Sequence, residues 1–144
     1  MKLSQLFIRT LKEAPADANT VSNKLLLRGS FIRKIAGGIY TLLPAGTLVL
    51  RNIEKIIREE LQKESIQEII LPLLNPKDLY PDIPADEHAF YVKDRSGRDF
   101  SIGTCFEEIV TDIIKKEVRS YREMPLFFYH TVPSLKDDNK AKGG

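Results

Sequence analysis

The stretch from Leu43 to Pro76 constrains the fold most, because it joins a long amphipathic helix to an apolar run interrupted by prolines. In its first half apolar residues recur at helical spacing and charged residues fill the positions between them. The apolar set is Val49, Leu50, Ile53, Ile56, Ile57 and Leu61. We therefore expect a helix with one buried face, and Thr47 is its expected N-cap.

The period changes after Glu64, where β-branched and other apolar residues run from Ile66 to Leu74. This run is too short and too interrupted for a second long helix, so it predicts a buried strand. Pro72 cannot donate a backbone hydrogen bond within a sheet. It is therefore expected at an edge, at a bulge or against another chain.

Elements on either side of this stretch follow from the same periodicities. A short helix is expected over residues 2–12 and must end near Pro15. A second helix is expected over Val21–Ala36 with Gly37-Gly38 as its C-cap, followed by a strand over Gly38–Leu43.

The second half of the chain predicts a loop, a hairpin, a helix and a strand. Residues 77–87 are proline-rich and acidic, and a hairpin with a Ser-Gly turn follows at Phe90–Ile102. The helix is expected over Glu107–Arg122, is stopped at Met124-Pro125, and leads to a strand over Leu126–Val132.

The composition is that of a globular protein: 42% of the 144 residues are hydrophobic and 29% are charged. A formal net charge of +2 is too small to indicate nucleic-acid binding by itself. The single cysteine excludes an internal disulfide, and no stretch is long and apolar enough to span a bilayer. A cytoplasmic protein is therefore expected.

The chain resembles the class II aminoacyl-tRNA synthetases, and within them the bacterial type of prolyl-tRNA synthetase. The similarity is carried by the helix and strand above and by three further segments. These are TLKEAPADA at 10–18, LLLRGSFIRKIAGGIYTLLPAG at 25–46 and EEIVTDIIKKEVRSYREMPLFFY at 107–129.

The resemblance implies an α+β fold, an antiparallel sheet flanked by helices, as a partial catalytic core over residues 1–135 with a polar tail at 136–144. It implies a dimer interface made by the first helix and strand, including Leu50, Ile53, Ile57 and Pro72. ATP, magnesium and tRNA are the implied cofactors and partner of such a core.

Two sets of substrate residues come from the same resemblance. The family's proline-binding loop places Cys105 where a threonine belongs and Glu107 at the acid that binds the substrate's ammonium. The second motif places Lys136 where an arginine should grip ATP and Asp138 where a glutamate belongs. Lysine lacks the planar fork that binds two phosphate oxygens at once, and a thiol is a weaker hydrogen-bonding group than a hydroxyl.

The chain also departs from the family in two places. No Gly-Arg-Trp motif occurs at residues 77–87, and the sequence stops at Gly144 before a third motif. We therefore expect a truncated prolyl-tRNA synthetase-like protein without aminoacylation of its own, which forms a homodimer or binds a synthetase chain. The alternatives are a fragment or split subunit of an active proline–tRNA ligase, and a tRNA-binding module.

Several residues have a second interpretation. The four basic residues Lys24, Arg28, Arg33 and Lys34 are either a solvated helix face or an RNA contact. Glu107 and Glu108 are either ligands or first-turn acids favoured by the helix dipole. Cys105 is either packed or a nucleophile. His88 and His130 lack the neighbouring ligands of a zinc site. The abrupt change of composition after Leu135 is also compatible with a frameshift.

Overall fold

The computed structural model describes residues 5–77, 88–103 and 106–137. The chain divides into two compact units, with the boundary between Glu60 and Leu61 near the end of a long helix. The predicted division into a domain at 1–135 and a tail at 136–144 stays a prediction, because residues 138–144 lie outside the described part.

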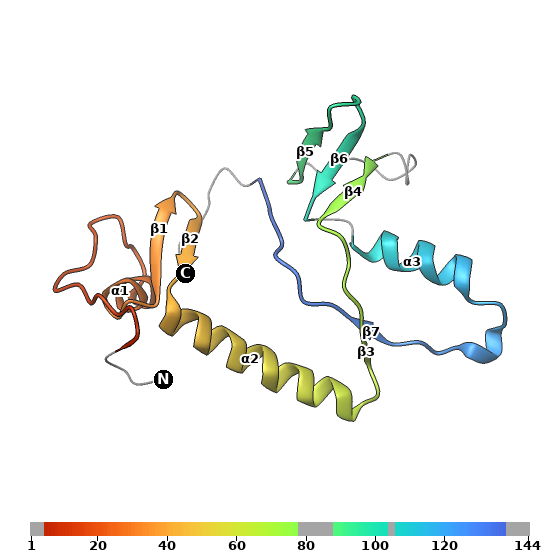
Figure 1. Cartoon of the computed structure of the whole chain (residues 1–144), viewed down its shortest axis with the longest axis horizontal. Helices are drawn as coiled ribbons and strands as arrows, with labels where there is room; N and C mark the ends of the chain where they lie inside the picture. The colour runs from red at the N-terminus through yellow and green to blue at the C-terminus, as the bar shows by residue number, and fades with distance from the viewer. Residues whose placement is uncertain (1–4, 78–87, 104–105, 138–144) are drawn as a thin grey trace. The chain divides into compact units, whose positions relative to one another are not determined.

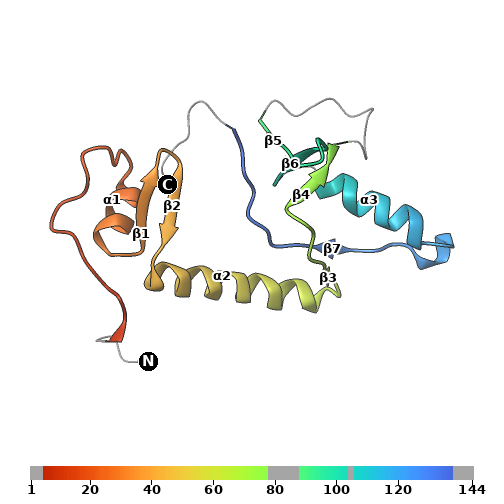
Figure 2. The same ribbon diagram turned by 45° about the horizontal axis from the view of Figure 1, so that its top comes forward.

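The first unit is built on a short helix and a β-hairpin, which lie side by side in Figures 1 and 2. Helix α1 spans Val21–Arg28, and Thr20 caps it by accepting a hydrogen bond from the backbone N–H of Asn23. Strands β1 (Ile32–Ala36) and β2 (Ile39–Leu42) pair antiparallel. A small core of Ala18, Leu27 and Ile32 joins the helix to the hairpin.

The single helix expected over Val21–Ala36 is wrong. The chain turns at Gly29 and Ser30, and Ser30 adopts a positive φ of 64° that a helix cannot continue through. The residues beyond form β1, where isoleucines at 32 and 35 favour extended backbone. Gly37-Gly38 is therefore the hairpin turn and not a C-cap, while the strand expected over Gly38–Leu43 is confirmed as β2.

Helix α2 spans Pro44–Lys63 and confirms the expected amphipathic helix. Thr47 is not its N-cap, because the helix already begins at Pro44, and the Thr47 N–H bonds to the carbonyl of Leu43. Proline suits a first helical position, where its missing N–H is not needed. A Cβ at Gly46 would lie 2.2 Å from the Phe31 carbonyl oxygen, so glycine lets the helix start directly against the hairpin.

Residues 5–12 form no α-helix, contrary to the expectation for residues 2–12. Their backbone donors bond to the end of α1 instead: the Arg9 N–H to Ser30 Oγ and the Leu11 N–H to the Arg28 carbonyl. The guanidinium of Arg33 adds a hydrogen bond to the Arg9 carbonyl. These contacts hold the segment against the end of α1 and the start of the hairpin.

The second unit contains two separate sets of strands. Strands β3 (Gln67–Glu68) and β7 (Phe128–Tyr129) form a parallel pair. Strands β4 (Leu74–Pro76), β6 (Asp99–Ile102) and β5 (Phe90–Lys93) form an antiparallel sheet in that order. The β5–β6 pair confirms the hairpin expected over Phe90–Ile102.

The buried strand expected over Ile66–Leu74 is wrong. It is replaced by β3 and β4, with Pro72 exposed in the irregular connection. Ile70 is 94% exposed, and only Leu71 is buried in that connection. Because Pro72 has no N–H to donate, the run cannot stay paired along its length.

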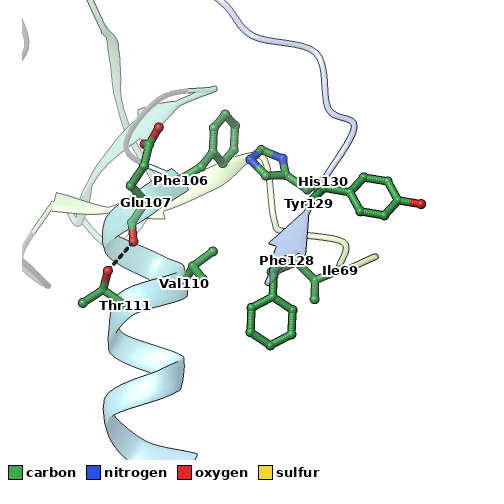
Figure 3. A pocket seen from close by; sticks show the side chains of 8 residues that line it. All are labelled: Ile69, Phe106, Glu107, Val110, Thr111, Phe128, Tyr129 and His130. Atoms are coloured by element: carbon green, nitrogen blue, oxygen red, sulfur yellow. Dashed lines mark hydrogen bonds between the residues drawn. The ribbon is translucent and has the colours of Figure 1, made fainter. Parts of the chain in front are cut away.

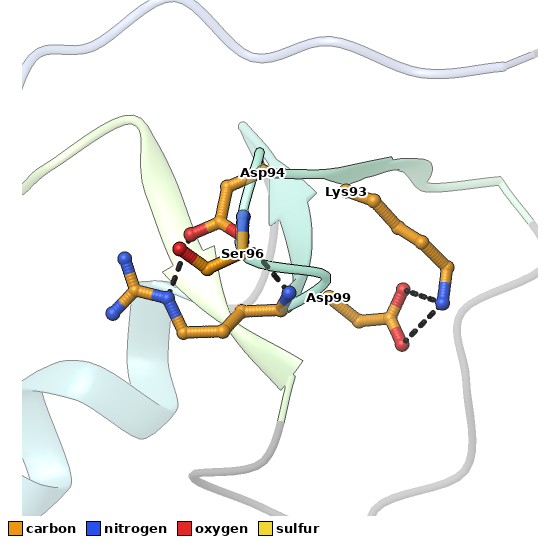
Figure 4. A network of polar contacts seen from close by, with 5 residues as sticks. Lys93, Asp94, Ser96 and Asp99 are labelled. Atoms are coloured by element: carbon orange, nitrogen blue, oxygen red, sulfur yellow. Dashed lines mark hydrogen bonds and ion pairs between the residues drawn. The ribbon is translucent and has the colours of Figure 1, made fainter.

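Asp94 organises the turn between β5 and β6, as Figure 4 shows. Its carboxylate accepts hydrogen bonds from the N–H groups of Ser96 and Arg98, at 2.8 and 2.9 Å, and from Arg98 Nε at 2.6 Å. Gly97 supplies the positive φ of 82° that the turn requires. These bonds lower the pKa of Asp94, the backbone bond from Arg98 contributing most.

Helix α3 spans Phe106–Glu117, so the expected helix exists but ends five residues before Arg122. A 3₁₀ turn at Tyr121–Glu123 follows it, ahead of Met124-Pro125. The strand expected over Leu126–Val132 is reduced to the two residues of β7, because its partner β3 is equally short.

Candidate functional site

The second unit has a hollow of about 320 Å³ between helix α3 and strand β7. Figure 3 shows its lining residues, several of which face one another from the helix and the strand. The hollow is lined by Ile69, Phe106, Glu107, Val110, Thr111, Phe128, Tyr129 and His130. Its walls are thus mostly hydrocarbon, with a few polar groups, as is typical of small-molecule sites.

An aromatic contact closes one side of the hollow. The rings of Phe106 and His130 lie 4.8 Å apart at a tilt of 57°. His130 Nδ1 and the Tyr129 hydroxyl are buried and have no hydrogen-bond partner within the described residues. Buried polar groups without partners are unfavourable, so His130 Nδ1 can gain from a polar ligand or water, whereas Figure 3 shows the Tyr129 hydroxyl pointing away from α3.

Glu107, in the first turn of α3, lines this hollow, and Figure 3 shows its carboxylate pointing toward the N-terminal end of the helix. The helix dipole favours an ionised acid at this position. Thr111, one turn later, uses its hydroxyl to donate a hydrogen bond to the Glu107 carbonyl, at 2.8 Å. A carboxylate beside an apolar wall can bind an ammonium whose remaining surface is hydrocarbon.

The segment that leads to Lys136 lies against Gly103, close to the start of the proposed proline loop. Ser134 Oγ donates to the Gly103 carbonyl at 3.3 Å, and a Cβ at Gly103 would meet the Leu135 nitrogen at 2.9 Å. Gly103 also has a positive φ of 68°. Glycine at this position therefore lets the backbone of Leu135 approach Gly103 closely.

The other sequence-predicted residues lie outside this hollow or outside the described part. Lys136 is exposed, and Cys105 and Asp138 lie beyond the described residues. Leu50, Ile53 and Ile57 are on α2, and Pro72 is in the connection between β3 and β4. Their roles remain predictions.

Among the four basic residues considered for RNA contact, Arg33 and Lys34 have intramolecular partners for their side chains. Arg33 donates to the carbonyls of Leu27 and Ile32, both at 2.8 Å, and Lys34 forms an ion pair with Asp17. Holding the chain together is therefore the role that these contacts support for Arg33.

Sequence reasoning missed the contribution of Tyr129 and His130 to the hollow. The helical spacing does indicate that Phe106, Glu107 and Val110 lie close together on one helix, which gives the α3 side of the hollow. What it could not supply is the parallel pairing of β7 with β3, which sets His130 against Phe106.

The described residues offer neither a cluster of metal ligands nor a membrane-spanning helix. Within the described part of the chain, no three His, Cys, Asp or Glu side chains gather in a way that could hold a metal ion. None of the helices there is long and apolar enough to cross a bilayer.

Comparison with known sequences gives strong similarity over the whole chain. A proline–tRNA ligase from Thermotoga neapolitana is 46% identical over 148 aligned residues, and one from a Janthinobacterium species is 42% identical over the same length. The whole chain is related to the proline–tRNA ligases. It spans only 26% of the length of either relative, and no family model matches it.

Solved structures support the fold independently. A prolyl-tRNA synthetase from Cryptosporidium parvum, complexed with halofuginone and AMPPNP, covers 91% of this chain with a TM-score of 0.75 at 16% identity. The Giardia lamblia prolyl-tRNA synthetase in complex with prolyl-adenylate covers 76% with a TM-score of 0.66 at 20% identity. This chain covers 28% and 24% of those two structures. The expected α+β fold of a partial synthetase core is confirmed, with the parallel β3–β7 pair as an addition.

Proposed function

We propose that this chain acts by association, using the apolar face of α2 to bind a second copy of itself or another synthetase chain. The observation that carries the proposal is the exposure of that face. Leu50, Ile53 and Ile57 are 41%, 49% and 50% exposed, and Gly46 is the only buried residue of α2. A monomeric soluble protein rarely leaves such a continuous stripe in water.

The energetic gain from covering the stripe is substantial. Fully burying one such side chain contributes about 1.5–3 kcal/mol, and the half-exposed residues here can still gain a large part of that. The opposite side carries Arg51, Lys55 and Arg58, which stay solvated in such an arrangement. The pattern supports helix pairing along one face.

Aminoacylation by this chain alone is not part of the proposal. By resemblance Lys136 stands where an arginine should grip the α-phosphate, and lysine offers a point charge without the bidentate fork. The proposal therefore assigns no ATP-dependent reaction to this chain alone. The proposed place of action is the cytoplasm.

Pyrophosphate exchange and mass measurement together test this proposal. The purified chain should self-associate at micromolar concentration and show no proline-dependent exchange of pyrophosphate into ATP. Robust exchange by the purified chain would overturn the proposal. A strictly monomeric chain that also fails to bind a prolyl-tRNA synthetase would do the same.

The hollow beside α3 favours a second candidate function, a proline-binding part of an active ligase. Its supporting observation is Glu107 at the rim of an apolar cavity. A pyrrolidine ring would lie against Phe106 and Val110 while its ammonium pairs with the carboxylate. Exchange activity that appears only when a co-purifying synthetase chain is added would favour this function.

A further inference from the structure

The sheet of strands β4, β6 and β5 in the second unit buries polar side chains on one of its faces (Figure 1). Residues directly opposite each other on antiparallel strands have their side chains on the same face. By this register Asn75, Ser101 and Tyr91 form one row across the three strands. Asn75 and Ser101 are buried, so the covered part of this face is polar.

The other face of the same sheet is made of apolar side chains. Its two rows are Leu74, Ile102 and Phe90, and then Pro76, Phe100 and Val92. Leu74, Phe90 and Val92 are 49%, 40% and 39% exposed. An antiparallel sheet with one solvated face normally turns its apolar side to the core and its polar side to water. The reversed pattern here indicates that a partner covers the apolar face.

Arg98 brings a positive charge to the edge of this apolar face. It lies two residues before Phe100 on the same strand side, and its guanidinium carbon is 5.5 Å from the centroid of the Phe100 ring. Its Nε donates to Asp94 at 2.6 Å. The two terminal nitrogens of the guanidinium supply further donors, which suit a carboxylate. A partner that covers the face can therefore gain from an acidic side chain at this edge.

The size of the face limits what can cover it. Three strands about 4.8 Å apart and three to four residues long present an area of roughly 200 Å². A stable interface between two globular proteins buries about 800 Å² on each partner, so this face alone is too small for one. A helix is about 10 Å across with its side chains, which suits the width of three strands.

A second copy of the same face is a poor occupant on grounds of charge. The two apolar rows contain no acid, so a copy packed face to face would bring a second Arg98 and no carboxylate to pair with it. An amphipathic helix with acidic residues beside its apolar stripe supplies both the apolar contact and the carboxylate.

We infer that this face binds one acidic amphipathic helix of a partner protein. The apolar stripe of that helix packs on the two rows, and one of its carboxylates pairs with Arg98. Helix on sheet is one of the standard two-layer arrangements of protein cores. The face belongs to the second unit, whereas α2 as far as Glu60 belongs to the first. The inference therefore goes beyond the proposed association through α2 and does not depend on it.

Binding of two synthetic peptides to the full 144-residue chain tests the inference. Both peptides are helices of about 18 residues with a leucine stripe at i, i+3, i+4 and i+7. One carries glutamate and the other lysine beside the stripe. The glutamate peptide should bind at least about tenfold more tightly, because it can pair with Arg98. Fluorescence anisotropy of the labelled peptides measures both dissociation constants.

Two variants locate the site, and a third is the matched control. Val92→Lys puts a charge into the apolar face and should weaken binding of the glutamate peptide at least about tenfold. Arg98→Gln should make the affinities of the two peptides nearly equal, because it removes the cation. Val21→Lys makes the same replacement at an exposed valine of α1 and should leave binding unaltered. Equal urea unfolding midpoints of the Val92→Lys and unmodified chains show that the loss is not one of folding.

Four results would overturn the inference. Two of them are equal binding of the two peptides to the unmodified chain, and no binding of the glutamate peptide at about millimolar concentration. The third is full binding by the Val92→Lys chain, which would place the peptide on another apolar surface such as α2. The fourth is loss of self-association in the Val92→Lys chain, which would make a second copy the occupant of the face.

Discussion

Helices α2 and α3 have the same kind of amphipathic sequence but differ in how their apolar faces are covered. On α3 Phe106 is 8% exposed, and Val110 and Ile114 are partly buried. On α2 the corresponding face is about half exposed along its length. Figure 3 shows β7 lying against α3, with His130 facing Phe106.

This difference shows that apolar periodicity predicts which face of a helix will be buried, but not which residues or which partner will cover it. The face of α3 meets residues from the same unit. The face of α2 is left for a partner under our proposal. Substitutions on the two helices should therefore affect different properties, association for α2 and folding stability for α3.

Adding charge to the apolar face of α2 should have the largest effect, which is a loss of self-association. Replacing both Ile53 and Ile57 by lysine should weaken self-association at least about a hundredfold, because two side chains worth about 1.5–3 kcal/mol each are lost. Sedimentation equilibrium measures the change. Gln62→Lys adds one positive charge on the opposite side of α2 and should leave association unaltered. If Gln62→Lys weakened self-association as much as the double replacement, the apolar face of α2 would not be the contact surface.

Truncation of Phe106 should affect stability strongly. Phe106→Ala should lower the free energy of unfolding by about 3 kcal/mol, since it removes a buried ring in contact with His130. Ile53→Ala, studied at concentrations where the chain is monomeric, should stay within about 1 kcal/mol. Urea unfolding followed by circular dichroism compares them. A larger loss for Ile53→Ala would mean that α2 is covered within the monomer.

Removal of the carboxylate from the α3 hollow tests ligand binding on the covered side. Glu107→Gln should weaken any proline binding about tenfold or more, because an ammonium loses its charged partner. Glu117→Gln, an exposed position at the other end of α3, is the control. Proline titration by calorimetry would distinguish them, and identical isotherms would remove Glu107 from the site.

Loss of the Asp94 charge on acidification should have the smallest effect. Asp94 has a pKa below its ordinary 3.8 in the folded chain. Its stabilisation is therefore present above that ordinary value and is lost as the pH falls through the lower folded pKa. Asp94→Asn should flatten this part of the stability profile. Self-association through α2 should be equally strong in the unmodified chain and in the Asp94→Asn chain. A difference would show that the β5–β6 hairpin takes part in the association.

Local patterns predicted α2, α3 and the β5–β6 hairpin, because each depends on residues close in sequence. They failed where one residue decides the backbone path. Ser30, with its positive φ, ends the helix expected through Ala36, and Pro72 divides the strand expected through Leu74. The hollow beside α3 depends on the pairing of Gln67 with Phe128, 61 residues apart in the sequence, which no local signal encodes.

Sedimentation equilibrium of the unmodified chain at micromolar concentration tests the central claim most directly. The account predicts a particle of twice the 16.4 kDa chain mass, held by the apolar face of α2. A single species at 16.4 kDa over the whole concentration range would contradict self-association through that face.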